Sequence, residues 1–140
     1  MKKIYFLAIF LILRVHTAAG SPADEVDPFI GTGGLGYGVG SAFPGPCVPF
    51  GMARPGPDTA LFGSHLSFHH CSGYHYSDNR IRGFSHVRLS GTGLPDYGNV
   101  LVMPTMNRED DYSNERSYRA GFSHRTEKAS PGYYAVTLEP

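Results

Sequence analysis

Histidine and cysteine side chains crowd into one short stretch of the chain. His69, His70, Cys71 and His75 fall within seven residues, and His86 follows eleven residues later. Imidazole and thiolate groups bind zinc or copper, and imidazoles also hydrogen-bond to the hydroxyls of a sugar. The spacing H-H-C-x-x-x-H matches no zinc-finger pattern, and H-E-x-x-H is absent. Three interpretations stay open at this point: a metal site, a sugar pocket, or hydrogen-bonded histidines with a purely structural role.

The glycine-rich stretch at residues 31–36, GTGGLG, matches the dinucleotide-binding pattern G-x-G-x-x-G. That function needs a helix to begin at the loop, so that the helix N-terminus can hold a pyrophosphate. The next residues, YGVGSAFPGP, cannot form a helix, because proline removes a backbone donor and glycine loses too much backbone entropy. We therefore expect a tight loop and no dinucleotide site.

No short sequence motif in the chain identifies the catalytic residues of a hydrolase. The nucleophile-elbow pattern G-x-S-x-G is absent. The two carboxylates of glycoside hydrolysis must lie on facing elements, and no pair of acidic residues stands out. Residues 90–98, SGTGLPDYG, form either a turn that needs its glycines or a loop where hydroxyls, amides and Asp96 converge.

The first twenty residues have the three parts of a secretory signal peptide. Lys2 and Lys3 precede an unbroken apolar run of ten residues at 4–13, and small residues at 17–20 offer a cleavage site. Ten residues are too few to span a bilayer, which takes about 20. We predict a leader over residues 1–20, one domain over residues 21–140, no membrane span, and a secreted or periplasmic protein.

Composition narrows the class of this domain. Without the leader the chain has 9 basic and 12 acidic residues, which excludes a basic nucleic-acid-binding protein. Glycine and proline make up 29 of the 140 residues, so the chain cannot be mostly helical. Secretion permits a disulfide between the two cysteines, Cys47 and Cys71, and two buried thiols are the alternative.

Short alternating segments predict an all-β domain. Residues 81–90 place Ile81, Gly83 and Ser85 on one face of a strand. Further strands are expected at residues 99–105, which form a buried apolar run, and at residues 118–125 and 133–139, which the turn at 130–132 joins as a hairpin. Residues 54–58 and 107–115 are expected to be loops. Five short strands favour a sandwich or barrel, and the final strand has no closing partner, which indicates a fragment of a longer chain.

Several strings follow one another through the chain: VDPFIGTGG at 26–34, FPG at 43–45, VPFGM at 48–52, PDT at 57–59, CSGYHYSD at 71–78, GFSH at 83–86, LSGTG at 89–93 and EKASPGYY at 127–134. Their order and density closely resemble the N-terminal domain of glycoside hydrolase family 92, the calcium-dependent exo-acting α-mannosidases. The resemblance covers nearly all of the chain after the predicted leader.

This resemblance implies a β-sandwich domain of the supersandwich kind, here incomplete, that packs on an (α/α)6 barrel which this chain lacks. It implies hydrolysis of the terminal α-mannosyl linkages of glycans with inversion, by one carboxylic acid and one carboxylate that activates water. It also implies calcium, an ion held by oxygen ligands. The family's acid, base and calcium ligands lie in the barrel, so no catalytic or metal-binding residue is carried over, and this portion alone is expected to be inactive.

Loops of the N-terminal domain form one wall of the mannose pocket in that family. The corresponding substrate-binding positions here are Gly33, Gly34, Phe68, His69, His70 and Cys71. Two places depart from the family's pattern. The family usually has a tryptophan shortly before CSGYHY, where Phe68, His69 and His70 stand, and a histidine after the glycine loop, where Leu35, Gly36 and Tyr37 follow. Both departures bear on linkage specificity more than on the fold.

Two alternatives to the mannosidase remain. A non-catalytic carbohydrate-binding module predicts that the domain binds mannose without a metal. A secreted domain that binds metal through residues 69–75 predicts stoichiometric zinc, lost when His70 and His75 are changed together.

Overall fold

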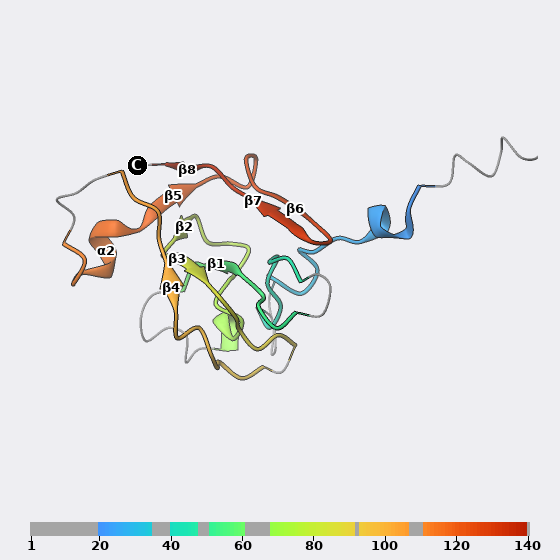
Figure 1. Ribbon diagram of the computed structural model, residues 1–140, viewed down its shortest axis with the longest axis horizontal. Coiled ribbons are helices and arrows are strands. Elements are labelled where there is room, and N and C mark those ends of the chain that lie inside the picture. The colour runs from blue at the N-terminus through green and yellow to red at the C-terminus, as the bar shows by residue number, and fades with distance from the viewer. Residues whose placement is uncertain are drawn as a thin grey trace, which may run out of the picture.

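The computed structural model describes residues 20–34, 40–47, 51–60, 68–91, 93–106 and 111–139. Apart from Gly20, the predicted leader lies outside these residues. Short strands dominate the described part of the chain (Figure 1). In chain order the elements are η1 (Pro22–Glu25), β1 (Gly56–Asp58), η3 (Phe68–His70), β2 (Arg80–Ile81), β3 (Gly83–Ser85), β4 (Leu101–Val102), α2 (Glu115–Tyr118), β5 (Ala120–Phe122), β6 (Lys128–Ser130), β7 (Tyr133–Ala135) and β8 (Leu138–Glu139).

The strands form two three-stranded antiparallel sheets and a hairpin. One sheet has the order β1-β3-β4, the other has the order β2-β5-β8, and β6 pairs with β7. Only Arg82 separates β2 from β3, so the chain steps directly from one sheet to the other at that point. The all-β prediction is confirmed.

Strand β1 corrects the prediction that residues 54–58 are a loop. Its Pro57 pairs with Phe84 of β3 in an antiparallel register. Proline cannot donate a ladder hydrogen bond and is tolerated at the edge of a sheet, and β1 is an edge strand. The proline and glycine content that predicted a loop is therefore compatible with this position.

The alternation predicted for residues 81–90 is confirmed for its first half. Ile81, Gly83 and Ser85 are buried, whereas His86 is exposed. The pattern then fails at Arg88, which is buried although alternation puts it on the face opposite Ile81, Gly83 and Ser85. A buried carboxylate, that of Asp58, draws this guanidinium inward, with 2.6 Å between Arg88 Nη2 and Asp58 Oδ2.

The run at residues 99–105 is not the buried strand that its apolar character predicts. It holds only the two residues of β4, which is an edge strand, and Val100 and Val102 are exposed. An edge strand can leave one of its faces in solvent.

The C-terminal hairpin forms at the predicted turn but with a different first strand. Residues 131–132 join β6 to β7, with Lys128 opposite Ala135. The segment predicted as a strand at 118–125 instead ends the helical turn α2 and continues as β5, which pairs with β2 and with β8. Within the predicted loop, α2 begins at Glu115 because the side chain of Asn114 accepts a hydrogen bond from Arg116 N, as an N-cap does.

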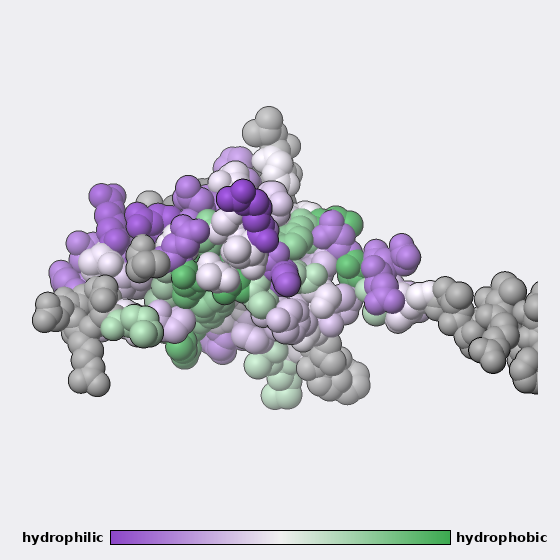
Figure 2. All heavy atoms as spheres, turned by 90° about the horizontal axis from the view of Figure 1, so that it is seen from above, coloured by the Kyte–Doolittle hydropathy of each residue, from purple (hydrophilic) through white to green (hydrophobic). Residues whose placement is uncertain are grey.

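The hydrophobic core is small. Its buried members are Tyr74, Ile81 and Phe122, and partly buried residues that pack on them are Phe43, Phe84, Met103, Val136 and Leu138. In Figure 2, polar side chains cover much of the face shown, and apolar ones emerge among them in patches. With so few apolar residues buried, hydrogen-bonded polar groups contribute a large part of what holds the described segments together.

Two further expectations concern cysteines and membranes. No disulfide joins Cys47 and Cys71: Cys47 is exposed, while Cys71 is 1% exposed, so the bridged alternative is wrong for this structure. The two sulfurs lie in different environments, one at the surface and one in the interior. None of the helices in the described ranges has the length and apolar character needed to cross a membrane.

Candidate functional site

The glycine loop lies against the segment that carries the histidines. Tyr76 N donates a hydrogen bond of 2.9 Å to the carbonyl oxygen of Thr32. A Cβ atom on Gly33 would lie 2.6 Å from the Cβ atom of Tyr76, so only glycine permits this approach. Residues that are more than 40 positions apart in sequence are thus brought together in one site.

A second backbone segment, residues 40–41, packs on the same histidines. Ser72 N donates to the carbonyl oxygen of Gly40 over 3.2 Å. Gly40 has a φ of +75°, and a Cβ atom there would collide with the carbonyl oxygen of His69. The close packing fixes the backbone on both sides of Cys71.

His70 and Asp78 form a tight pair within this site. His70 Nε2 lies 2.7 Å from Asp78 Oδ2. Burial tends to raise the pKa of the Asp78 carboxyl, but hydrogen bonds from His70 and Thr59 outweigh burial, so the pKa is lowered overall. Asp78 therefore remains a carboxylate that holds the imidazole of His70 in one orientation.

His75 is 8% exposed, and its imidazole is held through Nδ1, whereas that of His70 is held through Nε2. Its Nδ1 accepts a hydrogen bond from Ser77 N over 3.2 Å and lies 2.8 Å from Ser77 Oγ. Burial and the neighbouring His70 lower the pKa of His75, while Asp78 acts in the opposite direction. The ring is therefore neutral at neutral pH. Its centre lies 5.6 Å from that of His70 and 6.0 Å from that of His69.

Three buried polar atoms on these segments have no well-aligned hydrogen-bond partner among the described residues: His70 Nδ1, His75 Nε2 and Ser41 Oγ. The backbone of Gly34 nevertheless hydrogen-bonds to the His75 ring. Buried polar groups in folded proteins are nearly always paired, because an unpaired one keeps its full desolvation cost.

A shallow hollow of about 270 Å³ opens beside the glycine loop. Its lining residues are Asp27, Phe29, Thr32, Gly33 and Tyr76. The ring of Tyr76 stacks on His124 with centroids 4.2 Å apart, and Phe29 meets Tyr76 edge to face at 5.6 Å. The packed rings of Phe29, Tyr76 and His124 form an aromatic surface on this side of the site.

His124 connects that surface to a buried carboxylate. Its Nδ1 lies 2.6 Å from Glu127 Oε2, and the same carboxylate accepts hydrogen bonds from the hydroxyls of Tyr74 and Tyr134. Burial and the neighbouring Glu127 carboxylate raise the pKa of both tyrosines above the ordinary value of a phenol. The two tyrosine hydroxyls and His124 Nδ1 all pair with the Glu127 carboxylate, which gives this cluster a structural role.

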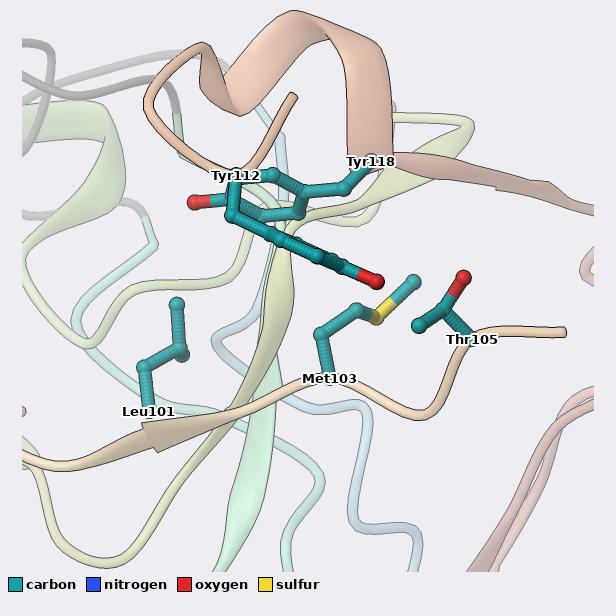
Figure 3. Close-up of a pocket in the computed structure, with 5 residues that line it drawn as sticks. All are labelled: Leu101, Met103, Thr105, Tyr112 and Tyr118. Atoms are coloured by element: carbon teal, nitrogen blue, oxygen red, sulfur yellow. The ribbon is translucent and has the colours of Figure 1, made fainter. Parts of the chain in front are cut away.

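Another hollow, of about 220 Å³, lies between β4 and α2, away from the histidines (Figure 3). The hydroxyl end of Tyr112 points toward Met103 and Thr105 there, while Leu101 and Tyr118 complete the lining. None of the sequence-predicted site residues lines this hollow.

The predicted substrate-binding residues fall into three groups. Gly33 and Gly34 face the segment at 75–76, with the backbone of Gly34 near the ring of His75. His70 and Cys71 lie inside the site, while His69 is exposed. Phe68 begins η3, and its side chain, like residues 35–37, lies outside what the structure describes.

Sequence reasoning missed the partners of these residues. Nothing in the sequence distinguishes Asp78, Ser41 or Ser77 from the other polar residues of the chain. The eight-residue separation of His70 and Asp78 across a turn matches no periodic pattern, so no signal in the sequence pairs them. The metal-binding alternative gains no support, because within the described ranges no group of three or more His, Cys, Asp or Glu side chains could hold a metal ion.

Comparison with known proteins places this chain in a family. The family model described as the glycosyl hydrolase family 92 N-terminal domain matches residues 25–140. An uncharacterized secreted glycosidase of Arthroderma benhamiae is 32% identical over 124 residues, which are 85% of this chain and 15% of the relative.

Solved structures agree with that match. A family 92 α-mannosidase of Bacteroides thetaiotaomicron, solved in complex with mannoimidazole, is 39% identical with a TM-score of 0.70, over 83% of this chain and 15% of that one. An inverting family 92 mannosidase of the same organism is 27% identical with a TM-score of 0.56, over 86% and 16%. The described strands thus match the β-sandwich-like N-terminal domain of these enzymes, and the chain spans about 15% of the length of the relatives it matches.

Proposed function

Since this chain belongs to glycosyl hydrolase family 92 and carries its N-terminal domain, we propose that it is the N-terminal part of an α-mannosidase that cleaves terminal α-mannosyl linkages of glycans with inversion. The relatives named as mannosidases support this substrate. The inverting relative supports the stereochemistry, in which water attacks the face opposite the leaving oxygen.

The observation that carries the proposal is the convergence of the glycine loop with residues 70–75. Gly33 and Gly34 come from one end of the chain and His70, Cys71 and His75 from its middle, and the backbone of Gly34 hydrogen-bonds to the His75 ring. The neutral imidazole of His75 and the backbone groups beside it suit uncharged sugar hydroxyls better than they suit an ion. These residues supply one wall of the mannose pocket.

The acid, the base and calcium belong, in this proposal, to the polypeptide that the relatives carry beyond this portion. The described residues do not fit a calcium ion, since they bring no three carboxylate or other metal-binding side chains together. The remaining polypeptide, an (α/α)6 barrel, is proposed to pack on this domain and to close the pocket from the other side. The portion described here is inactive by itself.

The decisive experiment is hydrolysis by the longer polypeptide that carries this chain. With 4-nitrophenyl α-mannoside we expect release of nitrophenol, and NMR of the first product should show the β anomer of mannose. The same polypeptide lacking residues 21–140 is the control and should be inactive. Initial release of the α anomer contradicts inversion. Mannoside binding without hydrolysis by the longer polypeptide favours the carbohydrate-binding module instead.

The leader is part of the same proposal. Positive charge, a ten-residue apolar run and small residues at 17–20 support export of the protein. N-terminal sequencing of protein recovered outside the cell should begin at Ser21. Recovery of an uncleaved chain only inside the cell contradicts export.

A further inference from the structure

His124 contacts two parts of the molecule at once: the buried carboxylate of Glu127 and the ring of Tyr76 beside the glycine loop. Its Nδ1 lies 2.6 Å from Glu127 Oε2. Its ring stacks on that of Tyr76, with the centroids 4.2 Å apart and the planes inclined by 17°. His124 therefore connects the buried polar cluster with the surface of the hollow that Tyr76 lines.

A tight turn and the core together set the direction of the His124 ring. Glu127 N donates to the carbonyl oxygen of His124 over 3.3 Å, and the preceding residue makes the same i→i+3 bond over 2.9 Å. Such bonds bring side chains three positions apart to the same side of a turn. Phe122, a member of the core, meets the His124 ring edge to face at 5.2 Å. The ring is thus anchored to the folded core from two directions.

Tyr76 is held between two rings of different origin. His124 covers one face of the Tyr76 ring, and Phe29 meets that ring edge to face at 5.6 Å. Phe29 belongs to the turn that enters the glycine loop, since its carbonyl oxygen accepts hydrogen bonds from the N–H and the hydroxyl of Thr32. Of the two rings, His124 is therefore the one that fixes Tyr76 relative to the core.

Tyr76 in turn sets the position of the glycine loop. Its backbone N–H donates to the carbonyl oxygen of Thr32 over 2.9 Å, and a Cβ atom on Gly33 would come within 2.6 Å of its own Cβ. The backbone of Gly34 hydrogen-bonds to the ring of the preceding residue, His75. Because atoms packed this closely transmit a displacement, a shift of Tyr76 must move the loop as well.

We propose that His124 is a positioning residue: by stacking on Tyr76 it fixes the backbone of the glycine loop, and with it the shape of the hollow of about 270 Å³ that Gly33 and Tyr76 line. His124 itself does not touch the sugar in this proposal. The role requires a flat ring held in place and does not depend on the protonation state of the imidazole. That the fixed loop binds a mannosyl unit rests on the proposed function.

The positioning role is tested without a sugar, by hydrogen exchange and mass spectrometry of the longer polypeptide. In His124→Ala the stack is lost, and the peptide covering residues 27–34 should exchange about fivefold faster, as the loss of one aromatic pair produces. Tyr134→Phe is the matched control, because it also removes one hydrogen bond from Glu127 but leaves the stack intact. Unchanged exchange in His124→Ala, or an equal acceleration in Tyr134→Phe, overturns the inference.

A second variant separates the stack from the contact with Glu127. His124→Phe keeps a flat ring against Tyr76 but cannot bond the carboxylate, so it should lower the stability of the fold while the peptide at 27–34 exchanges at the parent rate. The hydrogen bonds to Glu127 thus stabilise the fold, and the stack outside them orders the loop. If His124→Phe loosens this peptide as much as His124→Ala does, the contact with Glu127 orders the loop and the inference is wrong.

Hydrolysis of 4-nitrophenyl α-mannoside by the longer polypeptide tests the consequence for the substrate. We expect His124→Ala to raise KM about fivefold with kcat near the parent value, because the loop holds the sugar and does not carry the reacting groups. Tyr134→Phe and His124→Phe should retain the parent KM. In a Tyr76→Ala background His124→Ala should have no further effect on KM, since His124 acts through Tyr76. Additive effects of these two substitutions overturn the inference.

The two measurements separate this inference from the proposed function. If the longer polypeptide does not act on mannosides but only His124→Ala among the three variants loosens the peptide at 27–34, the proposed function fails and the positioning role stands. If exchange in that peptide is unchanged, the positioning role fails even when mannoside hydrolysis is observed.

Discussion

Tyr74 and His75 are neighbours in sequence, yet they belong to two buried polar clusters of opposite kinds. The hydroxyl of Tyr74 donates to Glu127, whose carboxylate also bonds Tyr134 and His124. The ring of His75 contacts Ser77 through Nδ1 and the backbone of Gly34, and its Nε2 has no well-aligned hydrogen bond among the described groups. In the closed cluster around Glu127 the buried hydroxyls are paired, whereas the open cluster around His75 keeps one buried nitrogen without a well-aligned partner.

The pair formed by Asp58 and Arg88 belongs with the closed kind. Arg88 makes two hydrogen bonds to the Asp58 carboxylate and one to the carbonyl oxygen of Tyr97, and Ser85 donates to the same carboxylate. Both charged side chains are almost fully buried. Closed clusters should respond to mutation through stability and open ones through binding.

The largest effect is expected where a closed cluster is opened around a buried charge. Arg88→Met leaves the Asp58 carboxylate buried and uncompensated, which should cost about 3–5 kcal/mol of unfolding free energy. Urea denaturation measures this loss, with the exposed Arg125→Met as the control. The double variant Asp58→Asn with Arg88→Met should recover much of it. A single variant as stable as the control contradicts the assignment.

Glu127→Gln should have the next largest effect. The substitution keeps the size of the side chain but removes the charge that three donors share, so we expect a loss of about 2–3 kcal/mol. Tyr134→Phe removes one donor and should cost about 1 kcal/mol. The order of the two midpoints in urea is the test, and equal midpoints argue that the charge contributes nothing.

The tyrosines around Glu127 should lower the stability of the fold at high pH, and His75 should lower it at low pH. The raised pKa values of Tyr74 and Tyr134 mean that the folded chain holds protons which the unfolded chain releases, so stability falls above about pH 10, by about 1.4 kcal/mol per pH unit for each tyrosine. The lowered pKa of His75 has the reverse sign, so stability falls as the pH drops below about 6.5. Unfolding midpoints measured from pH 5 to 11 check both arms, and His75→Phe should flatten only the acid arm.

The smallest effects separate a paired hydroxyl from an unpaired one. Ser72 Oγ donates to the carbonyl oxygens of Ser41 and Leu89, so Ser72→Ala should cost about 1 kcal/mol. Ser41 Oγ is buried without a partner, so Ser41→Ala should change stability by less than about 0.5 kcal/mol or increase it slightly. Thermal unfolding of the two matched variants decides the comparison, which fails if Ser41→Ala is the more damaging change.

Much of the fold can be predicted from local pattern. Alternation places Ile81, Gly83 and Ser85 on a buried face, and the turn at residues 131–132 forms where proline and glycine indicate it. The pattern fails where a distant residue decides the outcome. Arg88 is buried because Asp58, thirty positions earlier, pairs with it, and no window of local sequence contains both.

The candidate site shows the same limit. Resemblance to a family locates Gly33, Gly34, His70 and Cys71, and the structure brings their segments together. The orientation of the two imidazoles depends on Asp78 and on the backbone of Ser77. Those contacts exist only after the chain has turned back on itself, so residue type and spacing alone do not reveal them.

The order of strands in the two sheets determines which sheet can be completed first during synthesis on the ribosome. Sheet β1-β3-β4 is complete once Val102 has emerged, whereas β2-β5-β8 needs Glu139. At about 5–20 residues per second the 37 residues between these points take roughly 2–7 s to add. During the first 20 of those residues Ile81 has no complete β5 to cover it, and during the first 25 the hydroxyl of Tyr74 has no Glu127. Until its C-terminal strands have been synthesised, the nascent chain therefore holds all strands of the sheet β1-β3-β4 but only β2 of the second sheet.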